Sequence, residues 1–172
     1  MMRFHWFPGL VPLALLVGCQ SQTPTWIDYT MGEEARVGPL KYTVLDTVWR
    51  GQLGEGFKIR APQQRFFLIT IAVTNTGSDN ASIPLLSLEN QSGQMFRELE
   101  SSEGVENALG VLRDVGPGQT LKGRMLFDVG LASYKLRLSD GQPGSERYAR
   151  VEIPLRLDAD TGVQSLPGIP VR

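Results

Sequence analysis

The chain has 172 residues, with 17 Lys or Arg, 18 Asp or Glu, one His and a formal net charge of −1. This length fits one domain plus appendages, since domains usually have roughly 100–200 residues. Because there is no basic excess to neutralise a phosphate backbone, nucleic acid is a poor candidate partner. The 19 glycines and 11 prolines favour turns over long helices and predict an all-β globular domain.

The first 18 residues have the pattern of a cleaved secretory signal peptide. Arg3 supplies a basic start, and an apolar stretch over residues 10–17 follows it. This stretch is shorter than the roughly 20 residues that cross a hydrocarbon core. We therefore expect cleavage rather than a permanent transmembrane helix.

The residues Leu16, Val17 and Gly18 before Cys19 resemble the lipobox of bacterial lipoproteins. The resemblance implies cleavage before Cys19 and attachment of a diacylglycerol to its thiol. Two or three acyl chains anchor a protein stably, whereas one chain binds only marginally. Gln20 is not the Asp that, by the same resemblance, favours retention at an inner membrane. We expect a lipid-anchored protein of the cell envelope, on the outer membrane if the organism has one and otherwise on the outer face of the cell membrane.

Polar segments flank the expected domain. Residues 19–38 predict a tether that carries the lipidated Cys, and the sandwich domain is expected over 39–158. Within the tether, Trp26 and Tyr29 either touch lipid headgroups or form a first edge strand. Residues 159–172 contain Gly and Pro and predict a flexible C-terminal tail.

Period-two alternation of apolar and polar residues predicts about seven strands. Turn-forming Gly, Asn and Asp separate them at a spacing that suits an antiparallel β-sandwich. Residues 98–113 break the pattern and are expected to form a loop with one short helical turn. The expected strands lie at 40–50 (Tyr42, Val44 and Val48 inward), 66–75 (Phe67, Ile69, Ile71 and Val73 inward), 83–88, 95–96, 121–128 (Leu121, Met125 and Phe127 inward), 134–138 (even positions inward) and 148–158, an edge strand because of Pro154.

The order of these pieces resembles a bacterial family of unknown function with an immunoglobulin-like sandwich, found in lipoproteins and secreted proteins. Some members are labelled telomeric repeat-binding factors, which the charge balance does not support. The resemblance covers about 38–138 and implies an immunoglobulin-like antiparallel β-sandwich, similar to secreted immunogenic antigens, with a binding role and no established catalytic residues. The matching pieces are Tyr42-Thr43-Val44, the strand from Phe67 to Asn75, Ser92-Gly93, Gly116-Pro117-Gly118 and Phe127-Asp128.

The expected mature chain lacks the groups that most catalytic mechanisms use. Cleavage removes His5, and lipidation consumes Cys19, so neither an imidazole nor a free thiol remains. Ser-His-Asp catalysis, Cys-His catalysis and the common zinc sites all need these groups. We therefore expect a non-enzymatic protein with no cofactor and no metal.

Carboxylates leave one enzymatic alternative open. Glu98, Glu100, Glu103 and Glu106 cluster in the irregular segment. Two such carboxylates can divide the acid and base roles of a cell-wall glycan hydrolase. The other interpretation is a solvated, mobile acidic loop.

Aspartates at the ends of expected strands leave a third alternative, an ion-sensing or small-molecule-sensing domain. Asp46, Asp79, Asp128 and Asp140 can supply oxygens to Ca²⁺. The same residues can instead cap turns, and none of them has the spacing of a known calcium loop.

Aromatic residues beside a glycine-rich loop are candidates for partner binding. Trp49, Phe57 and Phe66 flank residues 51–56, where rings either stack on a partner or pack the end of the sandwich. Dispersed basic residues, Arg113 among them, are expected to solvate strand faces.

Our main hypothesis is a lipid-anchored, non-enzymatic envelope protein that presents loops or an edge strand to another envelope component. The candidate binding-loop residues are Trp49, Phe57, Glu98 and Glu103. The partners expected are the membrane, through the N-terminal lipid, and a second envelope protein.

Overall fold

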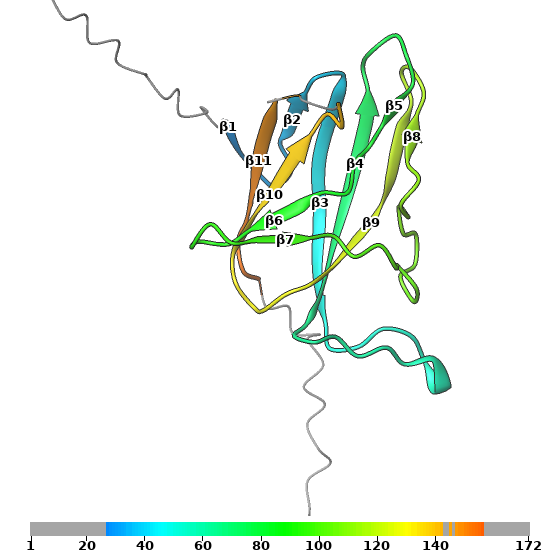
Figure 1. The fold of residues 1–172 in the computed structure, drawn as a ribbon, viewed down its shortest axis with the longest axis vertical. Helices are drawn as coiled ribbons and strands as arrows, with labels where there is room; N and C mark the ends of the chain where they lie inside the picture. Colours follow the sequence, from blue (N-terminus) through cyan, green and yellow to red (C-terminus); the bar gives the residue numbers. More distant parts are fainter. Residues whose placement is uncertain (1–26, 143–144, 146, 157–172) are drawn as a thin grey trace, which may run out of the picture.

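Two β-sheets packed face to face form the fold of residues 27–142, 145 and 147–156, which the computed structural model describes. The larger sheet has the strand order β1-β11-β10-β6-β7, and the smaller sheet has the order β2-β3-β4-β9. Figure 1 shows β1, β11 and β10 on one side of the sandwich and β3, β4 and β9 on the other. The predicted all-β sandwich is confirmed.

The strands of the larger sheet are β1 (Ile27–Thr30), β11 (Tyr148–Ile153), β10 (Tyr134–Ser139), β6 (Ser87–Glu89) and β7 (Met95–Arg97). Those of the smaller sheet are β2 (Glu34–Val37), β3 (Leu40–Arg50), β4 (Phe66–Asn75) and β9 (Thr120–Asp128). A separate short pair consists of β5 (Ala81–Ser82) and β8 (Asp114–Val115), and a 3₁₀ helix, η1, spans Gly56–Lys58.

Three strands of the described residues, β2, β5 and β8, were not expected from the sequence, because their two to four residues are too few for alternation to be recognised. The first edge strand, one of the two alternatives for Tyr29, is present as β1. The expectation of a purely antiparallel sandwich is also wrong, because β1 runs parallel to β11 and an isolated bridge between Ala108 and Arg124 is parallel too.

The folded domain begins before the predicted boundary at residue 39. Residues 27–37, expected to belong to the tether, form β1 and β2, and Ala35 and Val37 are buried in the core. Tyr29 lies in β1, the edge strand of the larger sheet, and packs against the core. The signal peptide, Cys19, Trp26 and the predicted tail lie outside the described residues.

Strand β11 is shorter than predicted and is not an edge strand. It pairs with β10 on one side and with β1 on the other. It ends at Ile153, directly before Pro154, because proline has no N–H to continue the ladder. The short β1 thus occupies the edge position that we expected β11 to have.

A β-bulge in β3 changes which residues face the core. Tyr42 and Val44 point inward as expected, but the pairing with β4 shifts register between Val44 and Asp46. Since one extra residue reverses the alternation of side chains, Thr47 and Trp49 are buried after the bulge. Val48, which we expected inward, is therefore only half-buried.

The main core lies between the two sheets and contains the inward residues predicted for β4 and β10. Aromatic rings join the sheets near the end of β3. Trp49 stacks on Phe67 with ring centroids 4.1 Å apart, and Tyr134 lies 6.2 Å from Phe67 and 5.9 Å from Phe96. Such ring contacts stabilise beyond the area that they bury.

A second apolar cluster lies on the outer face of the smaller sheet, where we expected polar contact with water. Leu68 of β4 and Leu126 of β9 are buried there together with Leu53 and Phe66. Residues 98–113, which we call the covering segment, run along the free edge of β9, where Leu99 N–H donates to the Leu126 carbonyl at 2.8 Å and Leu109 N–H donates to the Arg124 carbonyl at 3.0 Å. From there, Leu99 and Val105 pack against the outer cluster.

The covering segment has no helical turn, contrary to our expectation. Gly104 and Gly110 have φ values of 80° and 70°, which a right-handed helix cannot contain. The segment also approaches β9 closely at Gly123, a residue of that strand. A Cβ on Gly123 would lie 2.8 Å from the Asn107 carbonyl oxygen, so a larger residue there would push the segment away. The segment therefore follows the edge of β9 as irregular chain, with a single parallel bridge between Ala108 and Arg124.

The sandwich has two distinct ends. At one end, which we call the N-terminal end, Ile27 pairs with Ala149 and Tyr42 Oη donates to the Ser139 carbonyl at 2.6 Å. At the other, the loop end, β3 stops at Arg50 and residues 51–65 extend beyond the sheets before β4 begins (Figure 1).

Asn75 organises the turn that follows β4. Its buried side-chain amide donates to the carbonyls of Asp79 and Val115 at 2.7 and 2.8 Å. Its Oδ1 accepts a hydrogen bond from Gly77 N–H at 2.9 Å. One side chain thus joins β4, the turn and β8.

We predict that Asn75→Ala destabilises the domain, because it leaves buried backbone groups without partners. The expected loss is at least about 2 kcal/mol in the free energy of unfolding measured by urea denaturation. The control is Asn80→Ala, at an exposed position of the same turn, with a change within about 0.5 kcal/mol. Equal effects of the two variants would contradict this role of Asn75.

Candidate functional site

Residues 51–65 form a projecting loop at the loop end of the sandwich (Figure 1). Two backbone hydrogen bonds narrow its base: Leu53 N–H donates to the Arg60 carbonyl at 3.0 Å, and Arg60 N–H donates to the Leu53 carbonyl at 2.8 Å. Gly54 has a φ of 79°, and a Cβ there would clash with the Lys58 carbonyl oxygen at 2.2 Å. The tip beyond this bridge is η1 and contains Phe57.

The projecting loop is braced against the covering segment. Arg60 Nη1 donates to the Ser101 carbonyl at 2.9 Å, and the Arg60 guanidinium lies 5.2 Å from the Phe66 ring centroid. Gly104 approaches so closely that a Cβ there would lie 3.2 Å from Gly54 N. These contacts hold the base of the loop and leave its tip free.

Phe57 is fully exposed at this tip, and Ile59 beside it is 52% exposed. An aromatic ring in that position contributes nothing to the core, whereas aromatic residues commonly dominate the binding energy of protein interfaces. Lys58 lies between the two apolar residues. The tip can therefore bury apolar surface against a partner.

The prediction that Trp49 is a binding-loop residue is wrong. Trp49 is 4% exposed, because the bulge in β3 turns it into the core, where it stacks on Phe67. Phe66 is buried as well, in the outer cluster. Of the three aromatic residues that flank the loop in sequence, only Phe57 is available to a partner.

Glu98, named as a candidate binding-loop residue and expected either in a catalytic carboxylate pair or in a solvated acidic loop, is buried instead. It is 6% exposed and forms an ion pair with Arg113, whose Nη2 donates to Glu98 Oε1 at 2.5 Å. Arg113 is 1% exposed, so the expectation that it solvates a strand face is wrong too. Each residue is buried because the other supplies a compensating charge.

Backbone contacts complete this ion pair. Leu86 N–H donates to Glu98 Oε2 at 3.2 Å, and Arg113 Nε donates to the Gly110 carbonyl at 2.5 Å. Arg113 Nη1 is buried without a hydrogen-bond partner among the described residues. Burial raises the pKa of Glu98, and the Arg113 guanidinium and the Leu86 N–H limit that rise.

The remaining acidic candidates lie apart from this pair. Glu100, Glu103 and Glu106 are exposed, so Glu98 does not share their environment. Asp128 accepts hydrogen bonds from the N–H groups of Gln63 and Gln64 at 2.6 and 2.8 Å. The glycan hydrolase would have to use the exposed carboxylates without Glu98.

Asp140, another calcium candidate, is buried at the N-terminal end of the sandwich. Its oxygens accept hydrogen bonds from Gln142 N–H at 3.2 Å and from Ser145 Oγ at 3.0 Å. Desolvation and, secondly, the charge of Asp140 raise the pKa of the buried Tyr42. Among the described residues, no three His, Cys, Asp or Glu side chains come close enough to hold a metal ion.

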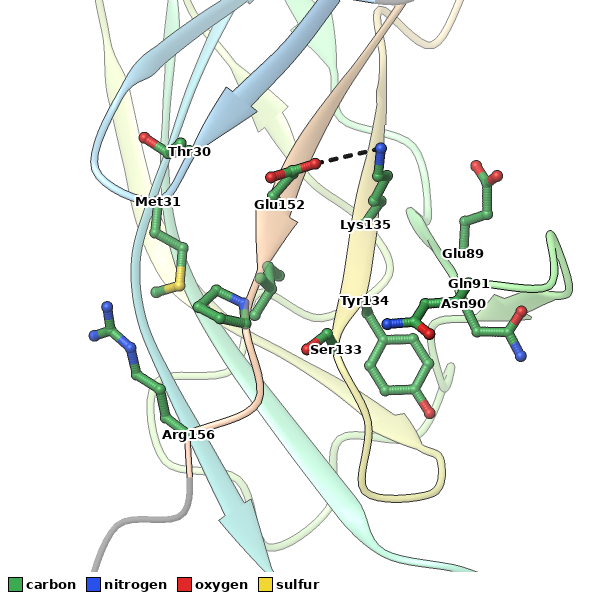
Figure 2. Close-up of a pocket in the computed structure, with 12 residues that line it drawn as sticks. Thr30, Met31, Glu89, Asn90, Gln91, Ser133, Tyr134, Lys135, Glu152 and Arg156 are labelled. Atoms are coloured by element: carbon green, nitrogen blue, oxygen red, sulfur yellow. Dashed lines mark ion pairs between the residues drawn. The ribbon is translucent and has the colours of Figure 1, made fainter.

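A groove of about 540 Å³ was not anticipated from the sequence. It crosses the larger sheet where β10 begins and β11 ends. Figure 2 shows the Lys135–Glu152 ion pair along one side, Met31 and Arg156 beside β11, and Glu89 beyond β10. No local pattern marks these residues, because they come from four separate parts of the chain.

An ion-pair network on the same sheet face fixes β1. Arg150 Nε donates to Asp28 Oδ1 at 2.7 Å, and Lys135 Nζ donates to Asp28 Oδ2 at 3.0 Å. The hydrogen bond from Arg150 and then that from Lys135 lower the pKa of Asp28 against an opposing effect of desolvation. The carboxylate therefore stays ionised to lower pH than an unpaired one, and the pairing is lost only as the pH falls through its lowered pKa.

The two packed sheets define the chain as a β-sandwich module. The model of one family, a domain of unknown function (DUF4352), matches residues 29–148, and the chain belongs to this family. The match confirms the expected family of unknown function and, like the structure, starts earlier than residue 38. No curated protein matches the chain.

Solved structures share the fold at low sequence identity. The yjhA protein from Bacillus subtilis is 20% identical, with a TM-score of 0.55, covering 73% of this chain and 98% of that one. A "putative lipoprotein (ycdA)" from the same organism is 14% identical, with a TM-score of 0.57, covering 73% of this chain and 39% of that one. The secreted protein MPT63 from Mycobacterium tuberculosis is 16% identical, with a TM-score of 0.52, covering 76% and 99%.

In the residues that the structure describes, no helix has the length and hydrophobicity to cross a membrane.

We predict that Glu98→Gln destabilises the domain strongly, because it leaves the Arg113 charge buried without compensation. The expected loss is about 3–5 kcal/mol in the free energy of unfolding, measured by urea denaturation. The matched control is Glu103→Gln, in the same segment but exposed, with an expected change within about 0.5 kcal/mol. The double variant Glu98→Met with Arg113→Met should lose less than Glu98→Gln. A mild effect of Glu98→Gln would show that the pair is not needed.

Proposed function

We propose that this chain is a lipid-anchored, non-enzymatic envelope protein that binds another envelope protein through its projecting loop. The observation that carries the proposal is the full exposure of Phe57 at the tip of a loop whose base is braced. A loop already held in place loses little conformational entropy on binding, which favours affinity. Phe57, with Ile59 beside it, is the expected central contact.

The arrangement of the two ends of the domain supports this function. Ile27 lies at the N-terminal end, and the projecting loop lies at the opposite end (Figure 1). Lipidated Cys19 would precede Ile27 by eight residues, a distance of at most about 28 Å when extended. An anchor there holds the N-terminal end near the lipid surface and directs Phe57 away from it.

The lipid anchor itself is supported by the sequence and by two relatives. Leu16, Val17 and Gly18 precede Cys19 as in a lipobox. One protein of similar fold is named a "putative lipoprotein" and another a secreted protein. We place the chain on the outer membrane where the organism has one, and otherwise on the outer face of the cell membrane.

We predict that a photo-crosslinking amino acid in place of Phe57 captures a specific envelope protein in intact cells. The ring position faces outward, so the probe would lie in the interface. The control is the same probe at Ser78, an exposed position in the turn after β4. Equal capture at both positions, or no envelope protein captured at Phe57, would contradict the proposal.

Phe57→Ala should abolish binding of the partner without destabilising the fold, because the Phe57 ring is fully exposed and packs against no part of the domain. We expect loss of co-purification with the captured protein and a change in the free energy of unfolding within about 0.5 kcal/mol. Trp49→Ala, which removes a buried ring near the same loop, should cost about 3–5 kcal/mol. If Phe57→Ala keeps the partner, the loop tip is not the contact.

Mass spectrometry of the membrane-extracted protein should show cleavage before Cys19 and acyl groups on that residue. Cys19→Ala should release the protein from the membrane fraction, because the acyl chains supply the attachment. An unmodified Cys19 in a membrane-bound protein would refute the anchor and leave the Phe57 contact to be judged by crosslinking.

A further inference from the structure

We propose that the groove on the larger sheet binds a short extended peptide with a positive charge at one end and a carboxylate at the other. This site is separate from the projecting loop and does not depend on the proposed function of that loop. The groove has a volume of about 540 Å³ and is open where β10 begins and β11 ends.

Opposite charges lie at the two ends of the groove. Arg156 is exposed beside Met31 at one end and forms no ion pair with a described residue. Glu89 lies at the other end and forms only a long ion pair, 3.9 Å, with Arg150, whose Nε and Nη2 donate to Asp28 at 2.7 and 3.1 Å. A ligand that meets both ends needs a negative group near Arg156 and a positive group near Glu89.

The middle of the groove offers no net charge. Lys135 and Glu152 pair with each other at 3.4 Å, and Lys135 also pairs with Asp28. Pro154, which is exposed, lines the same part of the groove and supplies apolar surface, whereas Ile153 of the lining is buried. The centre therefore fits uncharged or small apolar side chains.

The distance between the ends sets the length of the ligand. From the turn after β1 to β6 the groove crosses three strand spacings, about 14 Å in all. An extended peptide rises about 3.3 Å per residue, so about four residues span the groove. A single amino acid or a simple ion is too short to reach both charges.

The aromatic content of the groove argues against a sugar. Tyr134 is the aromatic residue of its lining, but it is 5% exposed. Its ring meets Phe96 at 5.9 Å, and its hydroxyl donates to the Gly130 carbonyl at 2.7 Å. No ring face remains for a sugar to stack on, whereas both charged ends suit a peptide.

The test uses the peptide Lys-Ala-Leu-Ala with a free carboxylate and the same peptide with a C-terminal amide. Binding to the purified domain is followed by NMR titration of backbone amides of β10 and β11. We expect the free acid to bind the wild type about tenfold more tightly than the amide, as for a charge-assisted contact. In Arg156→Ala this preference should disappear, because the carboxylate then has no partner in either peptide.

Glu89→Gln tests the other end. It should weaken binding of Lys-Ala-Leu-Ala about tenfold and have little effect on a peptide whose amines are both acetylated. The controls are Arg36→Ala and Glu103→Gln, exposed residues outside the groove, which should bind like the wild type. Thermal unfolding of each variant verifies that it is folded.

Three results would overturn the proposal. One is the absence of binding by Lys-Ala-Leu-Ala up to about 1 mM. Another is an acid-over-amide preference that survives Arg156→Ala, and the third is binding of a chitin oligosaccharide in place of the peptide. Phe57→Ala should leave peptide affinity unchanged, so failure here is distinguishable from failure of the loop contact.

Discussion

The buried ion pair between Glu98 and Arg113 holds together the part of the molecule that distinguishes it from a plain sandwich. It closes the covering segment at both ends: Glu98 N–H donates to the Leu86 carbonyl at 3.1 Å, and Ile83 N–H donates to the Arg113 carbonyl at 2.8 Å. The segment between them buries the outer apolar cluster and braces the projecting loop through Ser101. The position of Phe57 thus depends on an interaction remote from it in sequence.

The sequence predicts those strands whose apolar and polar residues alternate over neighbouring positions. The alternation through Phe67, Ile69 and Ile71 predicts both the strand and its buried face, because each residue's environment follows from the period of two. The bulge after Val44 escaped prediction, since one extra residue leaves the pattern on each side intact and only reverses its direction. That reversal decided whether Trp49 was a surface or a core residue.

The candidate sites were less predictable because they depend on long-range contacts. In sequence, Glu98 resembles Glu103, and only the position of Arg113 separates a buried carboxylate from an exposed one. For Phe57, the sequence left open whether the ring meets a partner or packs the end of the sandwich, and only the fold shows that it is exposed. The groove could not be predicted from the sequence, because its residues, among them Met31, Glu89 and Arg156, are far apart along the chain and come together only in the folded sheet.

The parallel pairing of β1 with β11 has a mechanical consequence. If the chain is held at its N terminus and grasped at the projecting loop, tension enters at Ile27 and runs along the axis of β1. The ladder to β11 and the Asp28 ion pairs are then loaded together in shear, rather than opened one after another as in unzipping. A strand of only four residues can in this way withstand a pull between two attachment points.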